Sequence, residues 1–215
     1  MPLNDLGKNR ALDGLDESLT SITHIGIGNA TDPGTGTNYA GTEATGGSPA
    51  YARAAVTWGA AAAGIKSNSG ALTHDVAAGT YAFYLFFNAS TGNTNNYLGY
   101  APINGTQKGF ATVDAADVTA NTITSSAHGL ANTNQVQVFN VFAESVPAGL
   151  TEGTVLFVVG AATDTFQLSL TSGGAAIDIT GIGEMFFQRL IPEVFASQGQ
   201  ITTAIAALVL DATTI

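Results

Sequence analysis

The residues best suited to acid–base or metal chemistry are three histidines, and they lie far apart in the sequence. None of His24, His74 and His128 has a second histidine four residues away, the spacing that would place two metal ligands on one face of a helix. His74-Asp75 is the only adjacent pair of a histidine and a carboxylate. For His128, the following Gly129-Leu130 predicts a turn between two strands. We therefore expect surface or turn roles, and we predict no metal site, no cofactor and no catalytic residue.

Motifs for phosphate binding and for nucleophilic catalysis are incomplete. Gly26-Ile27-Gly28 lacks the third glycine and the basic ending of a nucleotide-binding loop, and Asp32-Pro33-Gly34 predicts a turn instead. No Gly-x-Ser-x-Gly elbow is present. Glycan cleavage needs two carboxylates held close together, which a sequence does not reveal. These patterns favour a non-enzymatic protein.

Arg53 is informative because cationic residues are so scarce in this chain. Its guanidinium offers five donors, so it can hold a loop carbonyl, or a carboxylate such as Glu43, in bidentate fashion. We favour this structural role over a contact with another subunit.

Aromatic residues are concentrated around one segment. Trp58 and the aromatic side chains of residues 81–87 could stack on sugars, but aromatic residues that alternate along a strand usually fill a core. Both faces of 81–87 carry aromatic rings. This pattern predicts a strand covered on one side by its own sandwich and on the other by a neighbouring subunit.

The composition limits the partners that the chain can bind. Charged residues make up 10% of its 215 residues and hydrophobic residues 45%, with a formal net charge of −10. With six Lys and Arg residues, the chain lacks a basic patch for direct contact with nucleic acid. It has no Cys for disulfides, and no apolar segment long enough to insert into a membrane. A surface of Thr, Ser, Asn and Gly suits packing against other proteins.

Hydrophobic periodicity predicts a β-rich chain. We expect strands at 20–27, 51–58, 70–76, 81–87 and 96–103, and a long exposed loop at 28–50 that is rich in Gly and Thr. Leu3, Leu6, Leu12 and Leu15 predict a short N-terminal helix, which serves either core packing or an arm that grips a neighbouring subunit.

A second pattern of predicted strands begins near Phe110. Short strands are predicted at regular spacing, which indicates a small barrel or sandwich. The predicted ranges are 121–126, 134–140, 154–160, 164–170, 175–180 and 183–189. The final stretch, 191–215, fits strands or one apolar helix face, and we favour strands.

Five segments of the chain form a recognisable set, namely LNDLGKNRALDGL, ITHIGIGNATDPGT, GTEATGGSPAYARAAVTWGAAAAG, SNSGALTHDVAAGT and NYLGYAPI. Together they resemble a family of small virion proteins of tailed bacteriophages, the tail-fibre-like or minor tail proteins. The stretch between these segments and the C-terminus resembles a second module found in phage structural proteins, marked by His128-Gly129-Leu130, Pro147-Ala148-Gly149-Leu150 and Thr165-Phe166-Gln167-Leu168. The chain departs from the first family at residues 88–93, where a more acidic turn is usual.

The resemblance implies an antiparallel β-sandwich with a short N-terminal helix, at 1–109 plus 190–215, and a small β-barrel or sandwich inserted at 110–189. It also implies a structural role in a phage virion that is assembled in the host cytoplasm. A minor tail or fibre-associated role is expected first, then capsid decoration (a cement protein), then a receptor- or glycan-binding module. The expected partners are other virion proteins, namely tail or major capsid subunits. We also expect a homo-oligomer, with a trimer preferred because closed symmetry multiplies weak contacts.

Overall fold

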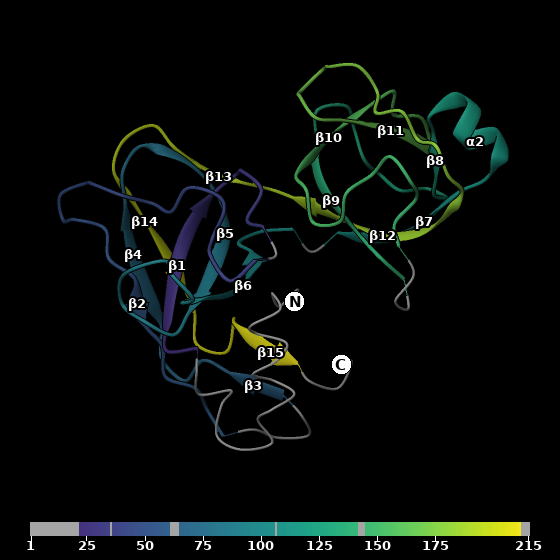
Figure 1. The fold of residues 1–215 in the computed structure, drawn as a ribbon. Helices are drawn as coiled ribbons and strands as arrows, with labels where there is room; N and C mark the ends of the chain where they lie inside the picture. Colours follow the sequence, from purple (N-terminus) through teal and green to yellow (C-terminus); the bar gives the residue numbers. More distant parts are fainter. Residues whose placement is uncertain (1–21, 35, 61–64, 106, 142–144, 212–215) are drawn as a thin grey trace. The chain divides into compact units, whose positions relative to one another are not determined.

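The protein is mainly β in the computed structural model, which describes residues 22–34, 36–60, 65–105, 107–141 and 145–211 (Figure 1). These residues form antiparallel sheets, a closed barrel and one short helix. The predicted fold class, an antiparallel β architecture with a second small β-barrel, is confirmed. The helix predicted around Leu3–Leu15 lies outside the described residues.

The chain divides into two compact units. The outer unit is discontinuous and comprises Met1–Ile103 and Pro192–Ile215, whereas the inserted unit comprises Asn104–Ile191. At the base of the inserted unit the amide of Ile191 donates to the carbonyl of Asn104 at 3.3 Å. The chain therefore enters and leaves this unit at one place. Its strands extend slightly beyond the predicted 110–189, since they begin at Lys108 and end at Leu190.

The outer unit is built on a five-stranded sheet with the order β13-β5-β1-β2, in which β6 also pairs with β5. The bounds are β1 (His24–Asn29), β2 (Ala54–Ala55), β5 (Gly79–Phe87), β6 (Tyr97–Pro102) and β13 (Glu193–Phe195). Two smaller sheets pair β14 (Gly199–Thr203) with β4 (Leu72–Val76), and β15 (Val209–Asp211) with β3 (Ile65–Ser67). The C-terminal stretch thus forms strands, as predicted.

β5 is the central strand of the outer unit and is buried on both faces. Tyr84 and Phe86 pack in the core with apolar residues of β1. On the other face Phe83 packs against Tyr100, with 5.2 Å between ring centroids, and is 0% exposed. The core role predicted for these aromatics is confirmed. The prediction that a neighbouring subunit covers one face of 81–87 is wrong, because the chain itself covers both.

The strand predicted at 51–58 is much shorter than expected. Only Ala54–Ala55 pairs with β1, and Trp58 makes an isolated bridge to Asn68. The segment departs from extended pairing because Tyr51 and Arg53 turn their side chains into a polar network described below. Trp58 is half-buried against the core, and its indole N–H donates to the carbonyl of Ile22 at 2.7 Å.

The inserted unit is a closed barrel with the strand order β10-β11-β8-β7-β12-β9. The bounds are β7 (Lys108–Val113), β8 (Ile123–Thr124), β9 (Gln135–Phe139), β10 (Leu156–Val159), β11 (Thr165–Ser169) and β12 (Gly183–Leu190). Because the described strands close into a ring, each of them pairs with two neighbours and none is an edge strand of an open sheet. Its interior is filled by side chains that include Ile123, Phe166 and Phe187.

Two elements of the inserted unit differ from what the sequence predicted. The helix α2 (Ala115–Ala120) was not predicted, although Asp114 and Asp117 form a reciprocal capping box at its start. The strand predicted at 175–180 does not form. There the amide of Ile177 donates to Leu168 and Ile179 fills the core, so the segment follows the barrel without a continuous ladder.

Candidate interaction surface

Three phenylalanines form a row across the outside of the inserted barrel. Phe186 on β12 lies opposite Phe110 on β7 and opposite Phe139 on β9 in the strand register. The rings of Phe110 and Phe186 meet edge to face, with centroids 5.8 Å apart. We call Phe139, Phe186 and Phe110 the phenylalanine row.

Strand alternation explains why the row points outward. Side chains of successive strand residues point to opposite faces, and the flanking Met185 and Phe187 are fully buried in the barrel core. Phe186 must therefore face out, and it is 43% exposed, while Phe110 is 44% exposed. An exposed edge-to-face aromatic pair is costly to leave in water and suits contact with another protein.

Neighbouring residues determine how far this open face extends. On one side of the row, the side-chain amides of Gln137 and Gln188 donate to the carbonyls of Gly153 and Gly105, so two loop segments lie over the glutamines. On the other side Thr112 is half-buried and Glu184 is exposed. The open face thus begins at the phenylalanine row and extends toward Glu184.

Charges of opposite sign stand on the two sides of the row. Lys108 pairs in register with Gln188, and Glu184 pairs with Thr112, with the Phe110–Phe186 pair between them. Both charged residues are exposed. Within the described part of the chain, neither of them forms an ion pair. Lys108 is therefore a basic residue beside the covered glutamines, and Glu184 is an acidic residue on the open side of the phenylalanine row.

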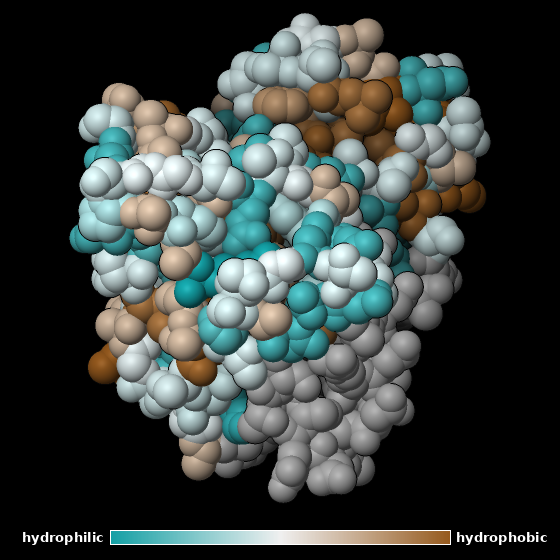
Figure 2. Space-filling view, turned by 60° about the vertical axis from the view of Figure 1, so that its left-hand side comes forward, coloured by the Kyte–Doolittle hydropathy of each residue, from teal (hydrophilic) through white to brown (hydrophobic). Residues whose placement is uncertain are grey.

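Other exposed apolar side chains are more scattered. Figure 2 shows one face of the molecule, on which brown patches lie among white, tan and teal residues. Besides Phe110 and Phe186, the exposed large apolar side chains of the described residues are Leu170, Ile182, Ile191, Val194, Ile205 and Val209. Most are single residues, which are normal on protein surfaces. The phenylalanine row stands out because strand pairing brings its members together.

Sequence reasoning did not single out the phenylalanine row. A usable signal was present in Met185-Phe186-Phe187, since consecutive large apolar residues on a strand must place one on each face. Phe110 and Phe139 become neighbours of Phe186 only through the strand register, which the sequence does not show.

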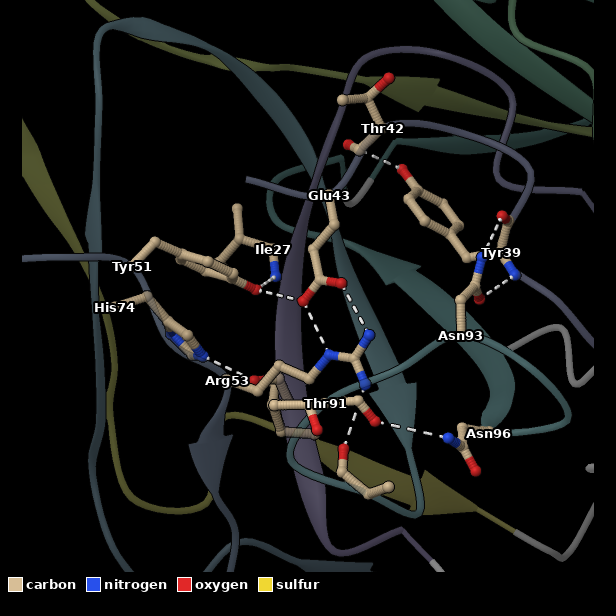
Figure 3. A network of polar contacts seen from close by, with 12 residues as sticks. Ile27, Tyr39, Thr42, Glu43, Tyr51, Arg53, His74, Thr91, Asn93 and Asn96 are labelled. Carbon is tan, nitrogen blue, oxygen red and sulfur yellow. Dashed lines mark hydrogen bonds and ion pairs between the residues drawn. The ribbon is translucent and has the colours of Figure 1, made fainter. Parts of the chain in front are cut away.

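A polar network in the outer unit is centred on Arg53 and Glu43 (Figure 3). Arg53 donates from Nε and Nη2 to the two carboxylate oxygens of Glu43 at 2.8 and 2.7 Å, and from Nη1 to the carbonyl of Ala89 at 3.1 Å. Its guanidinium carbon also lies 3.3 Å from the ring centroid of Phe87. The predicted bidentate role of Arg53 is confirmed, with both a carboxylate and a loop carbonyl as partners.

Tyr51 extends this network to β1. Its hydroxyl donates to Glu43 at 2.7 Å and accepts from the amide of Ile27 at 2.9 Å. Burial, and next the charge of Glu43, raise the pKa of Tyr51 far above its ordinary value, so the hydroxyl stays protonated. The carboxylate of Glu43 thus accepts hydrogen bonds from both Arg53 and Tyr51.

Gly26 explains the glycine motif on β1. A Cβ at this position would lie 2.9 Å from Oε1 of Glu43 and 3.0 Å from the hydroxyl of Tyr51. The missing side chain makes room for the network. Gly26-Ile27-Gly28 is thus a strand segment in which the missing side chains allow close packing.

The loop predicted at 28–50 is anchored more firmly than expected. Tyr39 is 6% exposed, its amide donates to the side chain of Asn93 at 2.7 Å, and Asn93 donates back to its carbonyl at 2.9 Å. Figure 3 shows this reciprocal pair beside the Arg53 network. The loop is therefore tied to the turn at 88–96, and its remaining residues are mostly exposed.

The histidines occupy separate structural positions. His74 is fully buried and its Nε2 donates to the carbonyl of Ile25 at 2.9 Å. Burial lowers its pKa, against the opposing effects of backbone hydrogen bonds and of Glu43. His128 accepts from the amide of Leu130 at 2.9 Å within the predicted turn, but it is buried rather than exposed. His24, on β1, bonds to Thr23.

Other possible sites in the outer unit are modest. A shallow pocket of about 450 Å³ lies between Asn29, Thr42 and Tyr81, and the carboxylate of Glu43 at its wall is already held by Arg53. Among the residues that the structure describes, no three His, Asp or Glu side chains are grouped as metal ligands. Within the same residues, no helix is both long and apolar enough to cross a membrane.

The chain has no match among the protein-family models, the curated proteins or the solved structures with which it was compared.

Proposed function

We propose that this chain is a non-enzymatic structural protein of a tailed-phage virion, and specifically a minor tail or fibre-associated subunit. The single observation that carries the proposal is the exposed phenylalanine row on a rigid barrel. Aromatic side chains are enriched at the centres of protein interfaces and depleted elsewhere on surfaces. The assignment to a phage particle is based on the sequence resemblance to tailed-phage virion proteins. The proposed contact surface is based on the position of the phenylalanine row.

The construction of the two units supports a mechanical role. The outer unit is fixed by a partly buried ion pair and by aromatic packing on both faces of β5, and the barrel is closed on itself. A closed barrel can present one face for docking without offering the edge strands of an open sheet to other chains. In this role the outer unit attaches to the particle and the inserted barrel presents its phenylalanine row to a neighbouring protein.

The proposal is tested by particle incorporation. Phages that carry Phe110→Ser with Phe186→Ser should contain much less of this chain in purified particles than the original phage, as measured by quantitative mass spectrometry. The matched control is Val194→Ser, which removes a 73% exposed apolar side chain from the outer unit and should incorporate normally. Full incorporation of the double variant, or the absence of the original chain from particles, would overturn the proposal.

The same measurement separates the tail from the head. A copy number far below that of the major capsid protein, with density at the tail, supports the minor tail role. A copy number comparable to the capsid subunits means capsid decoration. Specific binding on a glycan array that is lost in the phenylalanine double variant means a receptor- or glycan-binding module, because exposed aromatic rings also stack on sugars.

A further inference from the structure

We propose that the phenylalanine row is a twofold interface at which the inserted barrels of two copies of this chain pack face to face with their strands antiparallel. The inference rests on the proposed structural function and names the partner of the same surface. It keeps the expected homo-oligomer but replaces the preferred trimer by a dimer, because an isologous contact joins copies in pairs.

Charge complementarity identifies the second copy as the partner. Lys108 and Glu184 stand on opposite sides of the row, each two residues along its strand from a phenylalanine, or about 7 Å. A twofold axis that runs along the row reverses the strand direction in the second copy. Lys108 of each copy then faces Glu184 of the other, so the contact contains two symmetric ion pairs.

The alternative twofold arrangement is disfavoured by the same charges. If the axis ran along the strands, Lys108 would face Lys108 and Glu184 would face Glu184 across the contact. Like charges placed opposite each other weaken an interface and exclude that register. The positions of these two residues therefore select one of the two ways of stacking the faces.

The surface shape on the two sides of the phenylalanine row fits the antiparallel arrangement. The loop segments at Gly105 and Gly153 cover the glutamines on the Lys108 side, while the Glu184 side remains open. After the twofold rotation, the covered side of one copy lies against the open side of the other. The aromatic rings meet in the middle, where water is excluded.

Cross-linking tests the strand direction directly, because the chain contains no Cys and one introduced Cys is a unique label. Lys108→Cys and Glu184→Cys proteins are prepared separately, mixed, allowed to exchange and treated with a short bismaleimide. The mixture should yield covalent dimers and each variant alone should yield far fewer. Equal cross-linking of Lys108→Cys alone, or none in any sample, would overturn the proposal.

Charge reversal tests the ion pairs in the full chain by sedimentation equilibrium over a concentration series. Lys108→Glu and Glu184→Lys should each weaken dimerisation about tenfold or more, because each change converts two attractive contacts into two repulsive ones. An equal mixture of the two variants should recover the original affinity. The control Lys66→Glu makes the same charge change on β3 and should have no effect.

The outcomes separate this inference from the proposed function. If the original chain is monomeric, or the charge variants dimerise normally, while the Phe110→Ser/Phe186→Ser variant still fails to enter particles, then the row binds a different virion protein and only the self-pairing is wrong. If the serine variant enters particles normally and dimerises like the original chain, both are wrong. Thermal unfolding of each variant confirms that it is folded.

Discussion

At the scale of single residues, the Arg53–Glu43 pair is a contact that should be costly to break from one side. The Arg53 side chain is 5% exposed and that of Glu43 is 22% exposed, and the pair joins the segment before β2 to the turn after β5. Removal of one partner from such a pair leaves the other as an uncompensated buried charge.

We expect Arg53→Met to lower the free energy of unfolding by about 3–5 kcal/mol, the usual cost of breaking a buried ion pair from one side. Denaturant unfolding measures this loss in the free energy of unfolding. Glu43→Gln and the double variant complete a mutant cycle, and the double variant should lose much less than the sum of the two single losses. Additive losses would mean that the two side chains do not act together.

His74 provides a pH-dependent contribution to stability. Burial lowers its pKa in the folded state below the ordinary value of 6.5, so the unfolded state binds a proton more readily. The contribution of His74 to the free energy of unfolding is complete above pH 6.5. This contribution declines as the pH falls below 6.5 toward the folded-state pKa, by up to about 1.4 kcal/mol per pH unit. In His74→Gln this part of the slope should vanish. An unchanged slope in denaturant titrations from pH 7.5 to 5.5 would assign the effect to other groups.

Sequence reasoning succeeded at the residue scale where few partners were available. Arg53 is one of six cationic residues in the chain, and Glu43 lies close in sequence, so their pairing could be expected. The close packing around Gly26 could not be predicted, because it depends on how Tyr51 and Glu43 approach β1 after folding.

At the scale of elements, the two faces of each strand decide what its side chains do. The 81–87 segment was correctly predicted as a core strand, because an unbroken aromatic and aliphatic run can be hidden only in a central position. In β12 the same residue type has opposite roles, since Phe187 fills the barrel and Phe186 covers its outside.

This difference predicts contrasting effects of the same substitution. Phe83→Ala on β5 should cost about 3–5 kcal/mol, because it opens a cavity in a fully packed core. Phe110→Ala on β7 should cost much less, since the ring is 44% exposed. Comparison of the two unfolding free energies under one set of conditions checks the contrast. Equal losses would mean that the row is part of a core.

The errors in element prediction have local causes. α2 is six residues long, so its capping box was its only strong signal. The strands predicted at 51–58 and 175–180 alternate suitably, yet their backbones find few ladder partners because side-chain contacts direct the path there. Periodicity reports which residues are buried more reliably than which backbones pair.

At the scale of the whole molecule, the inserted unit has its own core and a closed hydrogen-bond ladder. We expect residues 104–191 expressed alone to fold cooperatively, with a sharp thermal transition and dispersed amide signals by NMR. The closely spaced ends Asn104 and Ile191 support this expectation, because removal of the outer unit leaves no gap in the ladder. A collapsed state without a cooperative transition would show that the barrel depends on the outer unit.

The two backbone crossings between the units have a consequence for resistance to proteolysis. A domain attached at a chain terminus is shed after one proteolytic cut in its linker. Here the chain passes between the units once near Ile103 and again near Pro192. A nick at either crossing leaves the barrel tethered through the other, so its release requires two separate cleavages.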